Sequence, residues 1–301
     1  MQKWIQELAQ APVGQVRFQE PLAPYTTWKI GGPADALIVP ENREELAAAL
    51  RLLHRHGVPW QVLGRGSNTL VSDKGVRGAV VKLGDGFDEA RFEGGTVTAG
   101  ASYSFIKLSV LAGKEGLTGL EFAGGIPGTV GGAVYMNAGA HGSDVSRIFQ
   151  SADIVWEDGS EAVLGTQEMA FSYRHSVLHD RRGIVTRAVF RLTPGNRTEI
   201  AAAMASYKDR RRRTQPLQEP TCGSVFRNPP GDHAARLIEA AGLKGMREGG
   251  AQVSLVHANF IVNLGGATAE DVLTLMGRIQ RTIEAKNGIQ LVPEVLLMGE
   301  R

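Results

Sequence analysis

Residues 122–142 read FAGGIPGTVGGAVYMNAGAHG, with seven glycines, one proline and no charged side chain before His141. Glycine loses more backbone freedom on folding than any other residue, so this density is unfavourable in an ordinary helix or strand. A chain tolerates it where the backbone must approach another group closely or adopt dihedral angles that a side chain would forbid. We therefore expect a backbone cradle for a large planar or phosphorylated cofactor. A tight buried turn between strands would explain some of these glycines, but hardly all of them.

The same stretch differs from other glycine-rich motifs. It matches neither the dinucleotide fingerprint G-x-G-x-x-G nor the phosphate loop that ends in Gly-Lys-Ser/Thr. It is long enough for a membrane span, but its glycines and Pro127 would break the helix that lipid requires. We therefore expect no contact with a membrane.

Length and composition are those of a globular enzyme. A chain of 301 residues, with 43% hydrophobic and 21% charged side chains, normally forms two or more structural units. A net charge of +2 gives no global attraction to nucleic acid or membrane, so a basic site must be local. The single cysteine, Cys222, excludes an intrachain disulfide and fits a reducing compartment. The N-terminus MQKWIQELAQAP has no apolar core of signal-peptide length, so we expect a cytoplasmic protein.

Apolar periodicity divides the chain into a β-rich first part and a helical second part. Short β-like segments dominate from residue 78 to residue 192, where Asp158-Gly159 marks a hairpin. Helical spacing of apolar residues occurs at 42–57, 104–114, 199–213, 232–243 and 268–288. The last of these segments begins with Thr268 and Asp271, a capping pair. The sequence therefore predicts an α+β protein of two units, the first of them bilobed.

A second glycine-flanked turn, Gly64-Arg65-Gly66-Ser67-Asn68, follows the first β-α-β unit. Successive backbone N–H groups with little side-chain obstruction suit a pyrophosphate. Gly-Ser-Asn is also ordinary turn chemistry, so the turn alone is weak evidence. Together with the cradle at 122–142, it is expected to hold the phosphates and the ring system of one dinucleotide.

Three polar features are candidates for chemistry, and each also has a plainer explanation. The segment 171–176 (FSYRHS) combines an aromatic, hydroxyls, an arginine and a histidine, as a surface loop also does. Ser224 follows Gly223 in a proline-bounded loop, where it either projects into a site or caps the loop. Glu294 is an isolated carboxylate amid apolar residues, so it lies either at an exposed edge or in a site.

The remaining polar features are weaker candidates. His257 and Asn259 are either ligands or residues of an exposed strand face. The basic cluster KDRRRR (208–213) is typical of a solvated helix end, where cations oppose the helix dipole. Nucleic-acid binding would require more basic and aromatic residues nearby. Cys222 is more often a small buried hydrophobe than a nucleophile. No histidine, cysteine and carboxylate grouping has zinc spacing, so we expect no metal.

The ordered motifs of this chain resemble those of the UDP-N-acetylenolpyruvoylglucosamine reductase (MurB) family, from about residue 21 to residue 299. The motifs are TTWKIGGPA (26–34), LGRGSNTLVSD (63–73), GLEFAGGIPGTVGGAVYMNAGA (119–140), FSYRHS (171–176), QPLQEPTCGSVFRNP (215–229), GLKG (242–245), HANFIVN (257–263) and LVPEV (291–295). The glycine cradle alone would indicate only the wider class of flavoproteins with a vanillyl-alcohol oxidase type FAD domain. The YR, GSVF and glutamate segments narrow the resemblance to the reductase.

The resemblance implies a two-lobed FAD-binding domain followed by a C-terminal α+β substrate-binding domain. The expected boundaries are 1–78 and 79–207 for the lobes and 208–289 for the substrate domain, with a strand in 290–301 returning to the second lobe. The implied reaction uses NADPH to reduce UDP-N-acetylglucosamine enolpyruvate to UDP-N-acetylmuramate, an early cytoplasmic step of peptidoglycan synthesis that serves cell shape and division. The implied partners are small molecules only, and the protein is expected to be monomeric.

The resemblance also assigns roles to residues of this sequence. Arg174 is expected to bind the substrate carboxylate, Ser224 to donate a proton, and Glu294 to stabilise the enol form. Non-covalent FAD binding is expected of Gly64, Arg65, Gly66, Ser67, Asn68, Gly125, Ile126, Pro127, Gly128, Thr129, Gly131, Gly132, Asn137 and Ala138. Substrate binding is expected of Tyr173, Arg210, Arg211, Asn228, His257 and Asn259.

The sequence departs from the family pattern at a few positions. Arg65 stands where glycine is frequent, and Leu255-Val256 replaces a pair that is commonly charged. After Leu192 there is no room for the long tyrosine-bearing loop of the first subtype, so the chain resembles the second subtype. The contacts to the UDP pyrophosphate must then come from other residues, such as Arg210 and Arg211. Two other hypotheses remain open: a flavin oxidase with a different substrate, and a nucleic-acid-binding protein that uses residues 210–213.

Overall fold

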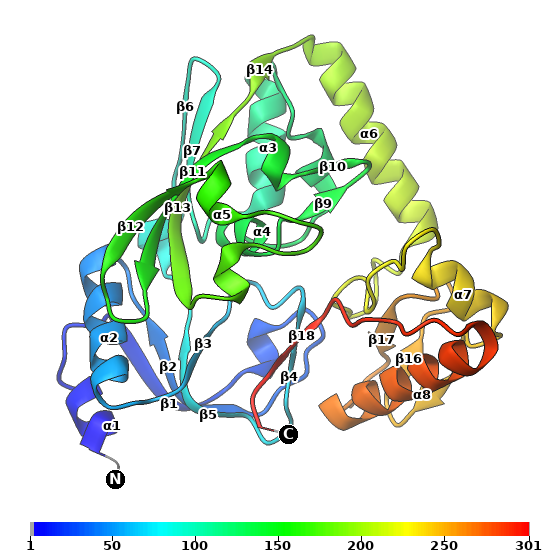
Figure 1. Cartoon of the computed structure of the whole chain (residues 1–301), viewed down its shortest axis with the longest axis horizontal. Coiled ribbons are helices and arrows are strands. Elements are labelled where there is room, and N and C mark those ends of the chain that lie inside the picture. Colours follow the sequence, from blue (N-terminus) through cyan, green and yellow to red (C-terminus); the bar gives the residue numbers. More distant parts are fainter. Residues whose placement is uncertain (1–2, 301) are drawn as a thin grey trace. The chain divides into compact units, whose positions relative to one another are not determined.

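The computed structural model describes residues 3–300, and the chain divides into two compact units (Figure 1). Unit 1 is built from residues 1–18, 36–64 and 78–210. Unit 2 is built from residues 19–35, 65–77 and 211–301. Each unit therefore combines segments that are distant in sequence. By their contacts, the N-terminal segments 19–35 and 65–77 belong with the C-terminal residues, whereas the sequence suggested consecutive domains.

The larger sheet of unit 1 is antiparallel, with the strand order β12-β11-β13-β7-β6. Its central strand β13 (Gly183–Arg191) alternates as a half-buried strand does, because Ala188 and Phe190 are buried while Arg187 and Arg191 are exposed. The sheet's other strands are β6 (Ala90–Glu93), β7 (Thr96–Gly100), β11 (Phe149–Trp156) and β12 (Glu161–Gly165). The expected hairpin at Asp158-Gly159 joins β11 to β12, and Gly159 has the positive φ of +79° that the turn requires.

Short helices and strand pairs complete this lobe. Helix α3 begins as expected after Ser104, whose side chain accepts a hydrogen bond from the backbone N–H of Lys107. Its buried residues join the core of the sheet, and α4 packs on β13. The elements are α3 (Phe105–Lys114), α4 (Val130–Tyr135), α5 (Thr166–Met169), β8 (Leu117–Thr118) with β14 (Thr193–Pro194), and β9 (Gly139–Ala140) with β10 (Ser143–Asp144).

A second sheet has the strand order β1-β2-β5-β3. Strands β3 and β5 pair in parallel through residues 60–62 and 79–81, all of them in unit 1. Helix α2 covers this region: Asn42 caps its first turn, and Leu46, Leu50 and Leu53 are buried on one face. The elements are α1 (Lys3–Leu8), β1 (Gln15–Pro21), β2 (Pro33–Val39), α2 (Arg43–Arg55), β3 (Trp60–Val62) and β5 (Val76–Val81).

Unit 2 packs two helices with a small antiparallel sheet of order β15-β16-β17. The expected capping pair at the start of α8 is present, because Thr268 and Asp271 exchange hydrogen bonds. Asp73 reinforces this end by accepting from the backbone N–H groups of Ala269 and Glu270. The elements are β4 (Thr69–Val71), α7 (Ala234–Ala240), β15 (Arg247–Glu248), β16 (Ala251–Val253), β17 (Ile261–Asn263), α8 (Ala269–Asn287) and β18 (Leu296–Met298).

Two expectations about the C-terminal residues need correction. The terminal strand was expected to return to residues 79–207, but β18 pairs in parallel with β4, at residues 69–71. The β-like run at 289–299 is also shorter than expected: only residues 296–298 form a strand, since Pro293 lacks the N–H that a continuous ladder needs.

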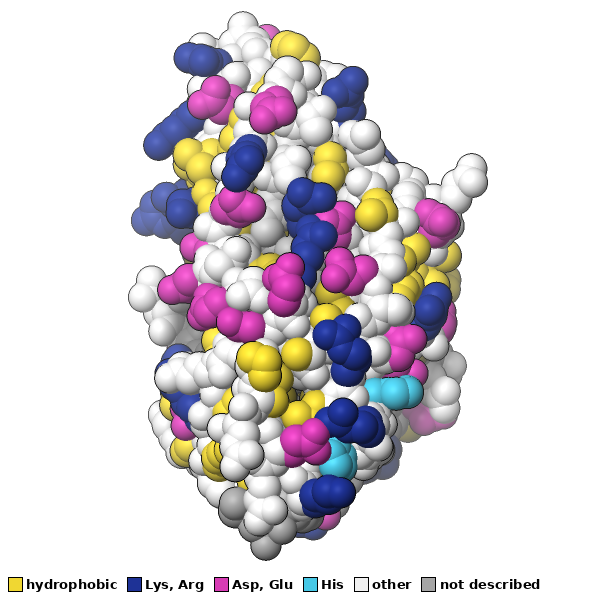
Figure 2. Space-filling model, turned by 90° about the vertical axis from the view of Figure 1, so that its left-hand side faces the viewer, with side chains coloured by type: hydrophobic (Ala, Val, Ile, Leu, Met, Phe, Trp, Pro, Cys, Tyr) yellow, Lys and Arg dark blue, Asp and Glu magenta, His cyan; other side chains and the backbone are white. Residues whose placement is uncertain are grey.

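Helix α6 (Arg197–Thr214) carries the basic cluster and crosses from unit 1 to unit 2 at residue 210. Ile200 is its only residue classed as buried, so most of its surface is in contact with water. Over the part of the chain that the structure describes, no helix has both the length and the apolar character to cross a membrane. On the face drawn in Figure 2, basic and acidic side chains are interspersed rather than gathered by sign.

Candidate functional site

The glycine-rich stretch folds into three short pieces within unit 1. Residues Glu121–Gly125 form a 3-10 helix, residues 126–129 are extended or turn-like, and α4 follows at Val130–Tyr135. Gly131 and Gly132 thus lie inside α4, although the entropy of glycine disfavours a helix. Thr129 compensates as the N-cap, since its hydroxyl accepts a hydrogen bond from the N–H of Gly132 at 3.2 Å.

Close approach to other atoms, rather than a left-handed backbone, explains the glycines at 131 and 139. Of the glycines from 124 to 139, all of them described, none has a positive φ. A Cβ on Gly131 would lie 3.0 Å from the Cβ of Ala101, whose carbonyl accepts from the Gly131 N–H at 2.9 Å. The stretch also lies beside Gly64, where an added Cβ would come within 3.1 Å of the Thr129 hydroxyl. Gly64 and the cradle, more than sixty residues apart in sequence, therefore converge in unit 1.

Asn137 is a link within the cradle. It is 3% exposed and has a left-handed φ of +42°, which asparagine tolerates better than most residues. Its side-chain nitrogen donates to the carbonyl of Ser172 at 2.9 Å, and its oxygen accepts from the N–H of Ser146. Its amide therefore joins the cradle to the FSYRHS segment.

Arg174 lies at the tip of a tight hairpin in that segment. Ser172 and His175 exchange backbone hydrogen bonds of 3.1 and 3.2 Å around Tyr173 and Arg174, and Arg174 has a φ of +56°. The Arg174 guanidinium donates to the carbonyl of Gly139 at 2.8 Å. Tyr173 is half exposed, with its ring 5.0 Å from the guanidinium carbon of Arg174. The hairpin is thus anchored to the end of the cradle.

Ser176 fixes the other side of the hairpin. It is fully buried, and its hydroxyl donates to the carbonyl of Tyr135 at 2.6 Å. Sequence reasoning missed both this anchor and the carbonyl of Gly139. The motifs FSYRHS and MNAGA contained these residues, but no local pattern shows which distant carbonyl a side chain will reach.

The turn after Gly64 belongs to unit 2 from Arg65 onward. Gly66 has a φ of +60°, and an added Cβ would lie 2.6 Å from the carbonyl oxygen of Tyr25, so only glycine fits. The carbonyl of Gly66 accepts from the backbone N–H and the hydroxyl of Thr27. Arg65 is exposed. The predicted cofactor residues are therefore divided: Gly64 and the cradle lie in unit 1, whereas Arg65 to Asn68 lie in unit 2.

Ser224 and Glu294 lie on two short extended segments that pair in unit 2. The N–H of Glu294 donates to the carbonyl of Val225 at 2.8 Å, and the N–H of Arg227 donates to the carbonyl of Val292 at 2.9 Å. Asn68 extends this ladder, because its side-chain nitrogen donates to the carbonyl of Glu294 at 3.1 Å. The structure thus brings the predicted proton donor, the predicted enol-stabilising carboxylate and one residue of the predicted phosphate turn into one hydrogen-bonded layer.

The remaining expected substrate ligands lie in different places. His257 packs edge-to-face on Phe260, with ring centroids 4.6 Å apart, and burial lowers the pKa of its imidazole. Asn259 is buried. The side-chain oxygen of Asn228 accepts a hydrogen bond from the N–H of Ala234 at the start of α7. Arg210 is exposed, while Arg211 is half-buried and its Nε donates to Gln215 at 2.9 Å. Burial also lowers the pKa of the Arg211 guanidinium.

Cys222 is 3% exposed, and burial together with the nearby negative charge of Glu294 raises the pKa of its thiol well above the usual value. A raised pKa keeps the thiol protonated at neutral and mildly alkaline pH, whereas the thiolate is the reactive form. We predict that native protein at pH 8 leaves Cys222 unmodified by an aromatic disulfide reagent, while unfolded protein reacts completely. Rapid modification of the folded protein would contradict this placement.

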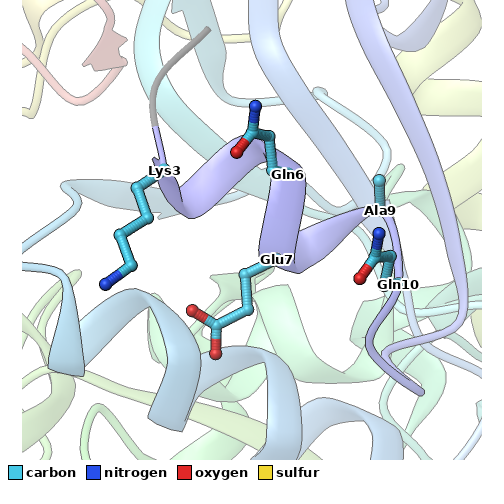
Figure 3. A pocket seen from close by; sticks show the side chains of 5 residues that line it. All are labelled: Lys3, Gln6, Glu7, Ala9 and Gln10. Atoms are coloured by element: carbon cyan, nitrogen blue, oxygen red, sulfur yellow. The ribbon is translucent and has the colours of Figure 1, made fainter.

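A hollow lies beside α1 in unit 1 (Figure 3). Lys3, Gln6, Glu7, Ala9 and Gln10 line it. The carboxylate of Glu7, which lines the hollow, hydrogen-bonds His56 at 2.6 Å and forms an ion pair with Arg55. The hydrogen bond from His56 lowers the pKa of Glu7. None of the predicted site residues contributes to this hollow. Among residues 3–300, no three His, Cys, Asp or Glu side chains are grouped to hold a metal ion.

The residues of the cradle fit a flavin dinucleotide. Gly64 leaves open the space in front of Thr129 that a side chain would fill, and Gly132 is exposed. A bare backbone of this kind allows a large planar group to approach closely.

Comparisons with known proteins agree with this arrangement. An FAD binding domain model matches residues 34–165, and a model of the UDP-N-acetylenolpyruvoylglucosamine reductase C-terminal domain matches residues 215–298. The reductase of that name from Bacillus licheniformis is 52% identical to this chain, and the match covers all of both proteins.

Solved structures support the same assignment. The reductase from Thermus caldophilus is 38% identical and superimposes with a TM-score of 0.81, over 94% of this chain and 98% of its own. Berberine bridge enzyme from Eschscholzia californica is 12% identical with a TM-score of 0.51, over 65% of this chain and 44% of its own. The second match concerns the fold alone. It is consistent with the FAD-binding architecture expected from the sequence. FAD is the cofactor of this protein, which belongs to the UDP-N-acetylenolpyruvoylglucosamine reductase family.

Proposed function

We propose that this protein uses NADPH to reduce UDP-N-acetylglucosamine enolpyruvate to UDP-N-acetylmuramate. This would be a cytoplasmic step of peptidoglycan precursor synthesis, and hence a requirement for cell shape and division. The observation that carries the proposal is the 2.8 Å hydrogen bond between Glu294 and Val225, which aligns the segments of Glu294 and Ser224. Full-length identity of 52% to a reductase of that name supports the choice of substrate.

Each of three side chains has a distinct chemical task in this proposal. FAD, once reduced, supplies a hydride to the terminal carbon of the enolpyruvyl group. Arg174 binds the substrate carboxylate through paired charge-assisted hydrogen bonds and stabilises the negative charge that grows there. Ser224 gives a proton to the neighbouring carbon and regains one from solvent. Glu294 hydrogen-bonds the enol form of the carboxyl group while that charge is present.

The remaining assignments follow the same reasoning. We propose that Gly64 to Asn68 and the cradle from Gly125 to Ala138 hold FAD without a covalent bond. Tyr173, Asn228 and His257 are proposed to contact the UDP-sugar, with Arg210 and Arg211 near its phosphates or those of NADPH. We also propose a monomer that acts on small molecules only. The domain functions expected from the sequence, with FAD bound by residues 1–207 and substrate by 208–289, belong to the same proposal.

Non-covalent FAD makes a simple prediction. The purified protein should be yellow, and acid precipitation should release its flavin into the supernatant, because residues 64–68 and 125–138 include no histidine or cysteine for attachment. Yellow colour that stays in the pellet would exclude non-covalent binding. Protein that is colourless and takes up no FAD would overturn the function as well.

The substrate is tested by following the flavin absorbance without oxygen. NADPH should bleach the colour, and UDP-N-acetylglucosamine enolpyruvate should restore it within one turnover. UDP-N-acetylglucosamine, which lacks the enolpyruvyl group, is the matched control and should leave the protein bleached. A flavin oxidase with another substrate would ignore both sugars and regain its colour rapidly in air.

The basic cluster gives a further prediction. A charge-assisted phosphate contact contributes roughly 1.5–3 kcal/mol, so Arg210→Ala or Arg211→Ala should raise the KM of the UDP-sugar or of NADPH about tenfold or more. Turnover should fall less, since such binding is equal in the ground and transition states. Arg212→Ala, on the same helix end, is the control. Unchanged KM values would identify the cluster as a solvated helix end.

A further inference from the structure

We propose that Asn259 is a positioning residue for the proton donor Ser224 and for Glu294, rather than a ligand of the substrate. This inference rests on the proposed function. It differs from the sequence-based expectation, which placed Asn259 among the substrate-binding residues.

The Asn259 side chain pairs with backbone groups as the edge of a neighbouring strand would. Asn259 is 4% exposed. Its Oδ1 accepts from the N–H of Phe226 at 3.0 Å, and its Nδ2 donates to the carbonyl of Phe226 at 2.8 Å. Its own backbone carbonyl accepts from the N–H of Val225 at 2.9 Å. Three hydrogen bonds therefore fix the two residues that directly follow Ser224.

The opposite side of the same segment holds Glu294. The carbonyl of Val225 accepts from the N–H of Glu294 at 2.8 Å, and Phe226 forms an isolated β-bridge with Pro293. Asn259 and Glu294 thus bind Val225 from its two sides. A displacement of this segment toward or away from Asn259 would change the separation between the Ser224 hydroxyl and the Glu294 carboxyl.

The chemistry of the side chain explains why an amide is needed. Phe226 presents one donor and one acceptor, and a carboxamide offers the complementary acceptor and donor in one plane. Aspartate would keep the acceptor but lose the donor, and alanine would lose both. A buried backbone group left without a partner is unfavourable, so the segment would shift to recover its hydrogen bonds. The amide oxygen and one amide N–H are already committed to Phe226, which leaves little of the group for a substrate.

Asn263 provides a matched control. It is also buried in unit 2, at 8% exposure, and its amide also bridges backbone groups. Its Nδ2 donates to the carbonyl of Trp28 at 2.9 Å, and its Oδ1 accepts from the N–H groups of Gly265 and Ala267. These partners are remote in the hydrogen-bond pattern from Ser224 and Glu294. Asn263→Ala therefore removes a similar clamp from the same unit without touching the proposed donor.

The test measures the two half-reactions of the FAD-loaded protein separately. We expect Asn259→Ala to be reduced by NADPH at the wild-type rate. Reoxidation by saturating UDP-N-acetylglucosamine enolpyruvate should slow by about 10²-fold, at the lower end of what general acid catalysis contributes. Asn259→Asp should lie between the wild type and Asn259→Ala. Asn263→Ala should be destabilised to a similar extent but reoxidise within about twofold of the wild type, since it leaves the donor in place.

Two readouts separate positioning from a general loss of stability. If proton delivery becomes limiting, reoxidation of Asn259→Ala should show a larger solvent deuterium isotope effect than the wild type, and Asn263→Ala should not. Ser224→Ala/Asn259→Ala should be little slower than Ser224→Ala alone, because residues that act together are non-additive. If Asn259→Ala does not fold, Asn259→Asp carries the same comparison.

The outcomes distinguish this inference from the function on which it rests. A wild type that is not reoxidised by the enolpyruvyl substrate would overturn the proposed function. If the wild type is reoxidised but Asn259→Ala and Asn259→Asp both behave like Asn263→Ala, the positioning role is wrong. A raised KM with an unchanged rate at saturation would instead return Asn259 to substrate binding.

Discussion

Ser224→Ala is expected to leave the reduction of FAD by NADPH nearly intact while slowing reoxidation by the enolpyruvyl substrate roughly 10²–10⁴-fold. The reason is that Ser224 is proposed to act only on the second carbon of the substrate, after hydride transfer. Stopped-flow absorbance of the flavin separates the two steps. Ser160→Ala is a suitable control, because Ser160 lies in the β11–β12 hairpin and its hydroxyl donates to the carboxylate of Asp158 in the same turn.

Arg174→Ala and Glu294→Gln should show the same separation, since both residues are proposed to act on the substrate rather than on NADPH. Reoxidation of Ser224→Ala at the wild-type rate would remove Ser224 from the mechanism. Cys222, two residues earlier, would then be the next proton donor to examine.

Trp28→Ala is expected to lower the free energy of unfolding by about 3–5 kcal/mol, the usual range when a large buried aromatic is truncated. Trp28 is fully buried in the core of unit 2, and its indole N–H donates to the carbonyl of Ile261 at 2.8 Å. This carbonyl also accepts from the Thr221 hydroxyl at 2.9 Å, so it keeps a partner in the variant. The loss should therefore come mainly from the cavity.

Denaturant unfolding of the FAD-loaded protein measures this effect through the transition midpoint. Trp28→Phe retains most of the ring and should lose clearly less stability than Trp28→Ala. Val163→Ala, at a side chain that is 64% exposed, should be nearly neutral. A Trp28→Ala midpoint equal to that of Val163→Ala would show that segment 19–35 does not support unit 2.

Local patterns in the sequence predicted those helices and turns that depend on the residues of a single segment. The helices at 43–55 and 105–114 lie where apolar spacing predicted them. The cap at Thr268 is present as expected, because a cap depends on residues three positions apart. The Asp158-Gly159 hairpin likewise depends only on residues that are neighbours in the sequence. The pairing of β18 with β4 was not predictable in this way, because it joins residues more than two hundred positions apart.

The candidate site was predictable as a set of residues but not as a set of contacts. Motif resemblance identified Arg174, Ser224 and Glu294, and these roles remain predictions. The structure adds what surrounds them. Asn137 and Asn259, both expected to touch ligands, have amides that bind backbone groups of the FSYRHS and GSVF segments. Within a sequence motif, a polar residue that binds a ligand cannot be told from one that holds the backbone in place. Its burial and its hydrogen-bond partners in the structure distinguish the two roles.

In the proposed reaction, FAD bound to this protein passes the electrons of NADPH to an enolpyruvyl sugar nucleotide. The most direct measurement is anaerobic turnover, with the products identified by mass spectrometry. We expect one NADPH to be oxidised per sugar nucleotide, and the product to carry two more hydrogens than UDP-N-acetylglucosamine enolpyruvate. An unchanged sugar nucleotide, with NADPH oxidised only when oxygen is admitted, would contradict it.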